Sequence, residues 1–260
     1  MPALKIAIQL SSLRLPFRKA IATAKRLGTD AVEIDARGEI RPAELTQTGL
    51  RELRRLLDDA GLRVAAVGFH THRGYDSPDE LERRLAATKA AMKFAADLRA
   101  SVVINQVGHV PAEPGGPGWN LLVQSLTDLS RHGQHIGALL AARTGSESGP
   151  DLARLLAALP ERGIGIDLDP GNLIINGFSP AEAVEQLGAH VLHVHARDGV
   201  RDLARGRGLE VPLGRGSADF PALLGALEEH QYRGYVTIAR QDAEEPEFEI
   251  GQAVKYLQSL

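Results

Sequence analysis

Eight short runs rich in β-branched and aliphatic residues recur along the 260-residue chain, separated by stretches whose apolar spacing of three and four is helical. Strands that alternate with helices imply βαβ units, parallel pairing and right-handed crossovers. Eight such units predict an α/β fold, a single-domain (β/α)8 (TIM) barrel over residues 1–260. The predicted strands are Lys5–Leu10, Ala31–Ile34, Val64–Phe69, Ser101–Gln106, Gly137–Ala142, Gly163–Leu168, His190–His195 and Tyr235–Ala239.

Local signals support this alternation. Ser77-Pro78-Asp79-Glu80 and Ser179-Pro180-Ala181-Glu182 each place a serine before a proline, with an acid three positions on. This arrangement is typical of a helix start, so we expect helices to begin directly after Ser77 and Ser179. An open dinucleotide-binding sheet is disfavoured, because the segment 11–14 after the first strand lacks the glycine fingerprint of that fold.

Composition excludes several classes of function. The 30 basic and 33 acidic side chains give a net charge of −3, whereas a nucleic-acid-binding protein is strongly basic. The chain has no cysteine, which excludes disulfides, cysteine zinc sites and thiol nucleophiles. The N-terminus does not resemble a signal peptide, and no apolar run is long enough to predict a membrane span. We therefore expect a cytoplasmic protein with no nucleic-acid or membrane partner; a homo-oligomer is compatible with the sequence.

The two-residue period of strands groups four polar residues. Asp167 and Asp169 share one face of the sixth predicted strand, and His193 and His195 share one face of the seventh. We expect Asp169 beside His195 at the carboxyl-end mouth of the barrel, where such a barrel builds its site, in a ligand-binding role. We expect Asp167 and His193 to form a layer below, as a buried hydrogen-bonded pair that holds the barrel.

Six segments in the same order resemble the sugar phosphate isomerase/epimerase group of xylose-isomerase-like barrels. They are GTDAVEIDARGEIRP (28–42), ARTGSESGPDLARLL (142–156), GIDLDPGNLI (165–174), HVLHVHARD (190–198), VPLGRGSADFPALLGAL (211–227) and YVTIARQ (235–241). The resemblance implies one divalent metal held by Glu, Asp, His and Glu at the ends of four consecutive strands. It also implies that the two glutamates move a proton between adjacent carbons of a sugar.

The chain departs from this pattern at two of the four ligand positions. The Asp and His ligands carry over onto Asp169 and His195, but the glutamate positions hold Arg143 and Ala239. A guanidinium repels a cation, and Arg143 is expected to form a bidentate ion pair with Asp169 instead. We therefore expect no metal of the family type. A divalent ion (Mn, Mg, Zn or Co) would need replacement ligands, for which the candidates are His72, Glu147 and Asp242.

The resulting hypothesis is a barrel with a degenerate metal site that binds a small sugar, sugar acid or phosphate ester at its mouth. We expect catalytic roles for His195, Asp169 and Arg143. The expected substrate-binding residues are His70, Gln106, Arg197, Gly214 and Gly216, the two glycines either offering backbone amides to an anion or forming a plain turn.

Several alternatives remain. The first is a metal-dependent sugar isomerase or epimerase with replacement ligands, in which Asp169 and His195 still bind the ion. The second is a metal-free enzyme that uses His195, His70 or Asp169 as base and Arg143 to stabilise an oxyanion. The third is a non-catalytic regulatory or structural barrel, or an inactive relative that only binds its sugar or anionic ligand.

Overall fold

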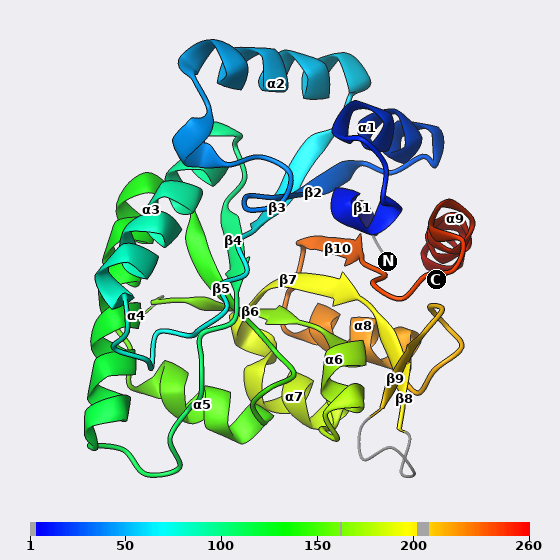
Figure 1. Cartoon of the computed structure of the whole chain (residues 1–260). Coiled ribbons are helices and arrows are strands. Elements are labelled where there is room, and N and C mark those ends of the chain that lie inside the picture. The colour runs from blue at the N-terminus through cyan, green and yellow to red at the C-terminus, as the bar shows by residue number, and fades with distance from the viewer. Residues whose placement is uncertain (1–3, 162, 202–207) are drawn as a thin grey trace.

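The computed structural model describes residues 4–161, 163–201 and 208–260, and it confirms the predicted (β/α)8 barrel (Figure 1). Eight parallel strands close into a ring in the order β1-β10-β7-β6-β5-β4-β3-β2. They are β1 (Lys5–Gln9), β2 (Ala31–Asp35), β3 (Arg63–Gly68), β4 (Val102–Asn105), β5 (Leu139–Arg143), β6 (Gly165–Leu168), β7 (Val191–Ala196) and β10 (Tyr235–Ile238).

Helices surround the ring (Figure 1). They are α1 (Phe17–Arg26), α2 (Gln47–Ala60), α3 (Leu81–Asp97), α4 (Pro117–Ile136), α5 (Gly149–Ala157), α6 (Pro170–Ile175), α7 (Pro180–Leu187), α8 (Phe220–Glu229) and α9 (Pro246–Gln258). Among the described residues, no helix is both long and apolar enough to cross a membrane.

Closure of the barrel brings the first and last strands together. Ile8 of β1 lies opposite Val32 of β2 on one side and Ile238 of β10 on the other. Strands of a parallel barrel are covered on both faces, which accounts for their nearly continuous apolar sequences. The exceptions are polar side chains that point into the barrel, and these build the site described below.

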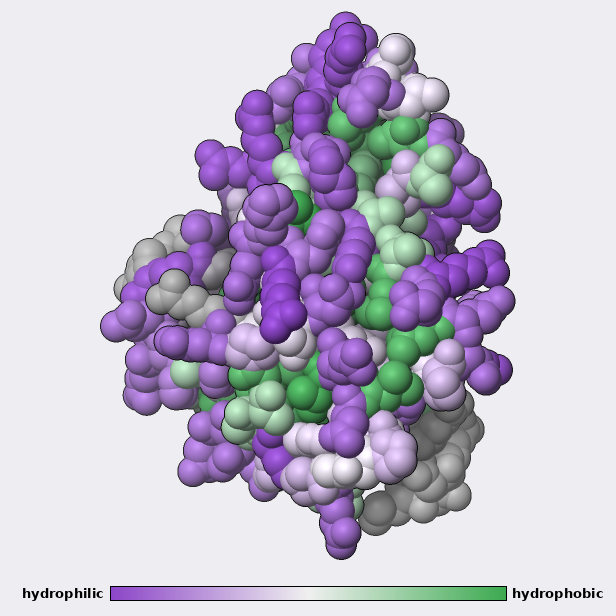
Figure 2. All heavy atoms as spheres, turned by 90° about the vertical axis from the view of Figure 1, so that its left-hand side faces the viewer, coloured by the Kyte–Doolittle hydropathy of each residue, from purple (hydrophilic) through white to green (hydrophobic). Residues whose placement is uncertain are grey.

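The largest hydrophobic cluster lies between the strands and the helices. Leu126 and Leu129 of α4 and Leu140 of β5 are among its members with no exposed surface. Outside, hydrophilic side chains cover most of the face over α3 and α4, with hydrophobic ones in narrow strips between them (Figure 2). The burial pattern therefore follows the helical period in the helices, whereas the strands are buried along nearly their whole length.

Only one of the two predicted helix starts is confirmed. Ser179 caps α7 and accepts a hydrogen bond from the Glu182 amide at 3.3 Å. The prediction at Ser77 is wrong, because α3 begins only at Leu81. Arg84 donates to the carbonyl oxygens of Ser77 and Asp79, and these bonds hold residues 77–80 as a turn.

A small antiparallel hairpin follows β7 and was not predicted. Its strands β8 (Asp198–Val200) and β9 (Leu209–Val211) are too short to show a period in the sequence. The hairpin carries Glu210 back over the carboxyl ends of the barrel strands, where its carboxylate contacts Arg197 and Arg240.

Candidate functional site

Asp169 lies at the mouth of the barrel, enclosed by two arginines and the start of a helix. It caps α6, with Oδ1 accepting the Asn172 amide at 2.8 Å. Its Oδ2 accepts Arg143 Nε at 2.9 Å and Nη2 at 2.5 Å, and Arg197 Nη1 at 2.9 Å. The predicted contact between Arg143 and Asp169 is present, but both nitrogens bind one oxygen because the helix cap occupies the other.

The charge on Asp169 is held in place by these arginines. Burial alone would raise the pKa of this carboxyl, but the positive charges of Arg197 and Arg143 outweigh burial and lower the pKa to about 2. Asp169 is therefore ionised and saturated with donors at neutral pH.

The ion pairs continue away from Asp169 as a chain of alternating charges, which we call the arginine network. Arg197 Nε donates to Glu210 Oε1 at 2.7 Å, and Glu210 Oε2 accepts Arg240 Nη1, also at 2.7 Å. Arg240 Nε in turn donates to Glu249 Oε2 at 2.8 Å. Each guanidinium in this network has a carboxylate partner, so the charges compensate one another in a largely buried place.

The positions that hold the family's metal do not fit a divalent ion in this chain. Arg143 supplies positive charge where a carboxylate ligand belongs, and Ala239 has no ligand atom. Asp169 is fully buried, and two arginines and a backbone amide already bind its carboxylate.

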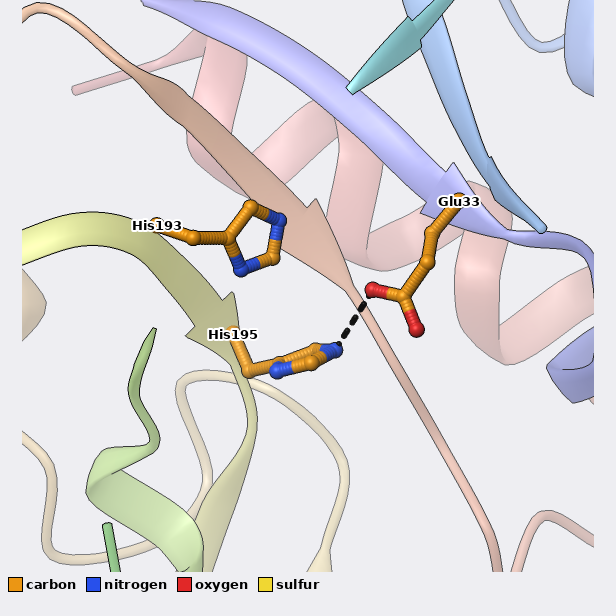
Figure 3. Close-up of side chains that lie close together, drawn as sticks. All are labelled: Glu33, His193 and His195. Atoms are coloured by element: carbon orange, nitrogen blue, oxygen red, sulfur yellow. Dashed lines mark ion pairs between the residues drawn. The ribbon is translucent and has the colours of Figure 1, made fainter. Parts of the chain in front are cut away.

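A second buried group, which we call the imidazole cluster, consists of Glu33, Asp167, His193 and His195. Asp167 bridges the two rings: His193 Nδ1 lies 2.8 Å from Oδ1 and His195 Nδ1 lies 2.7 Å from Oδ2. Glu33 reaches across from β2, and its Oε2 lies 2.8 Å from His195 Nε2 (Figure 3). His193 Nε2 contacts the Thr237 hydroxyl at 2.7 Å.

This geometry adds a pairing that the sequence did not predict. The Asp167–His193 contact is present, and His195 also pairs with Asp167. His195 acts on Asp169 through its charge, which helps to lower the pKa of that carboxyl, while the hydrogen-bond donors to Asp169 Oδ2 are Arg143 and Arg197. The register between β6 and β7 shifts after Ile166, and β6 ends at Leu168. Asp169 therefore lies beyond the strand, where the two-residue period no longer sets its direction.

The imidazole cluster carries strongly shifted pKa values. Burial would lower the pKa of His195, but the carboxylates of Asp167 and Glu33 outweigh it and raise the pKa to about 10. Burial would raise the pKa of Glu33, yet the neighbouring histidines lower it to about 2. At neutral pH the His195 ring is therefore an imidazolium between two carboxylates.

Glu33 was not among the predicted site residues. It lies in the buried part of β2 between Val32 and Ile34, and Gln9 Nε2 donates to its Oε1 at 2.8 Å. An acid flanked by Val32 and Ile34 in a buried strand was the available signal, because such a carboxylate is buried only with partners.

A pocket of about 280 Å³ opens at the carboxyl ends of β1, β2, β3 and β10. Its lining residues are Gln9, Ser11, Ser12, Arg14, Glu33, Asp35, His70, Arg240 and Gln241. Burial and the charge of Arg143 lower the pKa of His70 to about 4, so its ring is uncharged at neutral pH. A pocket of about 580 Å³ lies at the opposite, amino-terminal end of the strands, where barrels of this type do not carry out chemistry.

Other predicted residues lie away from this pocket. Gln106, His72 and Asp242 are exposed, and none of the three lines the pocket. Glu147 accepts the Val110 amide at 3.2 Å and lies 3.4 Å from His109 Nδ1, outside the imidazole cluster. Of the predicted replacement ligands, none belongs to the Glu33, His193 and His195 group whose ligand atoms lie within 4.8 Å of one another.

The predicted anion site at Gly214 and Gly216 is occupied by a side chain of the protein. Asp198 Oδ2 accepts the amides of Gly214 at 3.0 Å and Gly216 at 2.8 Å. Its Oδ1 accepts the amides of Gly199 at 2.8 Å and Ala218 at 3.0 Å. The loop does bind a carboxylate through backbone amides, but the carboxylate is internal.

The fold and the sequence together define the class of this protein. Residues 21–260 match the family model of the xylose isomerase-like TIM barrel, and the chain belongs to that family.

Two curated relatives show what kinds of protein this chain is similar to. It is 26% identical over 220 residues to the rhizopine catabolism protein MocC of Rhizobium meliloti, covering 73% of this chain and 66%, just under two thirds, of the relative. It is 22% identical to an inosose dehydratase of Clostridium botulinum over 87% of this chain and 83% of the relative.

Solved structures share the fold. A xylose isomerase domain protein from Planctomyces limnophilus has a TM-score of 0.86 and 24% identity, covering 99% of this chain and 97% of that one. A xylose isomerase-like barrel from Mycobacterium smegmatis, solved in complex with magnesium, has a TM-score of 0.77 and 15% identity over 99% and 95% of the chains. The 3-keto-D-glucoside 4-epimerase YcjR from E. coli has a TM-score of 0.75 and 18% identity over 99% and 100%.

Proposed function

We propose that this chain is a sugar-modifying enzyme of the isomerase, epimerase or dehydratase kind, acting on a small neutral polyhydroxylated compound at the mouth of the barrel. Membership of the xylose isomerase-like family supports the enzyme kind, as do relatives that include an inosose dehydratase and a 3-keto-D-glucoside 4-epimerase. A location in the cytoplasm is part of the same proposal.

The observation that carries the proposal is the polar lining of the 280 Å³ pocket. Gln9, Glu33 and His70 place amide, carboxylate and imidazole groups along one wall. Such groups donate to and accept from hydroxyls, and a few of them fix the orientation of a small ligand.

Charge favours a neutral ligand over a sugar acid or a phosphate ester. The guanidiniums of Arg143, Arg197 and Arg240 are paired with carboxylates, and the Gly214 and Gly216 amides bind Asp198. The pocket wall carries the carboxylates of Glu33 and Asp35 and the guanidiniums of Arg14 and Arg240. Arg240 is paired with carboxylates, and Arg14 donates to backbone carbonyl oxygens of residues 241 and 243. An anion would displace existing partners, whereas a hydroxyl needs no such exchange.

His70 is the proposed proton acceptor, because its ring is uncharged at neutral pH and lines the pocket. Glu33, held by Gln9 and His195, is the proposed partner of a substrate hydroxyl. The catalytic roles expected of His195, Asp169 and Arg143 stay predictions. Arg143 pairs with Asp169, and His195 pairs with Asp167 and Glu33, and these buried ion pairs support a positioning role in which the three side chains fix the charges around the pocket.

The experiment is to follow deuterium uptake from D2O by proton NMR with neutral keto sugars, sugar acids and sugar phosphates as separate arms. We expect exchange at a carbon next to a carbonyl with a neutral sugar, and a loss of at least about tenfold in His70→Ala. His72→Ala is the matched control, since this exposed histidine two positions on lies outside the pocket. Exchange confined to the anionic arms, or equal rates in both variants, would reject the proposal.

A second candidate, a metal-dependent enzyme with replacement ligands, is favoured by one observation. Glu33, His193 and His195 offer one ligand atom each, all within 4.8 Å of one another.

A further inference from the structure

We propose that the imidazole cluster is a transition-metal site, with Zn²⁺ as the ion that fits it, held by Glu33 Oε2, His195 Nε2 and His193 Nε2. The site shares His195 with the family pattern, but its other ligands come from β2 and from the layer below the mouth. It is therefore displaced from the positions of Arg143, Asp169 and Ala239, which do not fit an ion.

Hydrogen bonds to Asp167 set the orientation of both rings. Each Nδ1 faces one oxygen of the same carboxylate, at 2.8 Å from His193 and 2.7 Å from His195. A carboxylate only accepts, so each Nδ1 carries the hydrogen. When the rings are neutral, both Nε2 atoms therefore hold a free lone pair, the arrangement by which a carboxylate orients histidine ligands of a metal.

Two buried atoms in the cluster lack a proper hydrogen bond. Glu33 Oε2 and His195 Nε2 lie 2.8 Å apart, yet neither has a hydrogen-bond partner of acceptable geometry among the described residues. Each atom is therefore the other's partner as an ion pair, without the geometry of a hydrogen bond. A carboxylate oxygen and an imidazole nitrogen that face one another need a cation between them, which is either a proton or a metal ion.

The donor set favours a transition metal. Two imidazoles and one carboxylate suit Zn²⁺ and other transition-metal ions, whereas Mg²⁺ and Ca²⁺ prefer oxygen ligands alone. Three protein ligands leave one tetrahedral position for water or a substrate oxygen. Glu33 lines the 280 Å³ pocket, so this position would lie toward the proposed ligand.

One contact competes with the ion. Thr237 Oγ1 lies 2.7 Å from His193 Nε2 and donates to it when that nitrogen is unprotonated. Replacing this hydroxyl by a methyl group frees the nitrogen without removing a ligand. Thr237→Val is therefore expected to tighten Zn²⁺ binding several-fold, a gain that a purely structural role of the cluster does not predict.

The experiment is a calorimetric titration of the chelator-treated full chain with Zn²⁺ alone, together with Co²⁺ absorption spectra. We expect one ion per chain, a visible Co²⁺ band of tetrahedral intensity, and a loss of at least about tenfold in affinity in Glu33→Gln. Glu147→Gln is the matched control, because this glutamate is also buried but lies outside the imidazole cluster, and the Zn²⁺ affinity of the variant is expected to stay within about threefold of the parent.

Three outcomes would overturn the inference. Binding lost in Asp169→Asn but kept in Glu33→Gln assigns the ion to the family positions. If the parent chain binds no stoichiometric Zn²⁺, the cation between Glu33 and His195 is a proton and not a metal ion. If the Zn²⁺ affinity is unchanged in Thr237→Val and also unchanged in His193→Asn, then His193 is not a ligand. No sugar is present in this titration, so its result is independent of the ligand proposed above.

Discussion

At the scale of single residues, Arg143 and Asp169 show how a buried ion pair depends on both partners. Asp169 has no exposed surface, and Arg143 is 8% exposed. Together with Arg197 they form a small group in which one carboxylate oxygen is shared by two guanidiniums. Removing one member of such a group leaves charge without compensation in a place from which water is excluded.

We expect Arg143→Met to lower the free energy of unfolding by about 3 kcal/mol, the lower end of the range for a broken buried pair, because Arg197 still contacts Asp169. Urea unfolding followed by circular dichroism measures the change. Arg41→Met is the control, since its pair with Glu44 is exposed and should contribute less than about 1 kcal/mol. Equal effects of the two substitutions would contradict the predicted role of burial.

At the scale of elements, loops and helix starts are held by individual side chains that accept backbone amides. Asp198 organises the segment between β9 and α8 by accepting four amides, three of them from residues 214–218. Gly216 is required there, because a Cβ atom at this position would lie 2.1 Å from Asp198 Oδ1. The carboxylate and the glycine therefore depend on each other.

We expect Asp198→Ala to lower the free energy of unfolding by about 3 kcal/mol, because amides that bind a charged acceptor lose it. Sulfate should restore part of this stability by occupying the vacated place, as seen in urea unfolding with and without the salt. Asp219→Ala removes a carboxylate that caps α8 through one amide, that of Ala222. This control should lose about 1 kcal/mol, with no specific rescue by sulfate.

The two predicted helix starts make a second test at this scale. Ser179→Ala should lower the free energy of unfolding by about 1 kcal/mol, because its hydroxyl caps α7. Ser77→Ala should change it by less than about 0.5 kcal/mol, because Ser77 lies in a turn before α3 and only its carbonyl oxygen is used. Thermal and urea unfolding of both variants measure these changes, and equal losses in the two variants would contradict the capping role of Ser179.

At the scale of the whole molecule, the barrel brings β2 and β7 close enough for Glu33 to meet His195. The pKa of His195 is raised in the folded chain to about 10, against about 6.5 when unfolded. Between pH about 6.5 and 10, the folded protein therefore keeps a proton on His195 that the unfolded protein has lost. Its stabilising effect is complete below pH about 6.5 and disappears as the pH rises toward 10.

For the metal-free protein we expect the free energy of unfolding to fall by up to about 1.4 kcal/mol per pH unit between pH 7 and 9. Urea unfolding at several pH values in the presence of a chelator measures this slope. His72→Gln should keep the slope, because this histidine is exposed and outside the cluster. A flat profile in this range would show that His195 is not held as an imidazolium.

The sequence predicted the barrel well, because eight apolar runs and the helical periods between them are local patterns that burial enforces. Two pairs of side chains at neighbouring strands were also predicted, Asp167 with His193 and Arg143 with Asp169. Asp169, just beyond the end of β6, depends on a register shift that no local pattern reveals. The Glu33 contact joins residues 162 positions apart in the sequence, and the unpredicted hairpin alone brings Glu210 to the arginines.

The ion pairs around Asp169 also limit which substitutions this protein tolerates. A metal centre of the family type requires acids at both 143 and 239, where this chain has arginine and alanine. Arg143→Glu made alone would place a second carboxylate against Asp169 and leave a buried negative charge with too few partners. A stepwise route to such a centre that begins with Arg143→Glu therefore passes through a less stable protein.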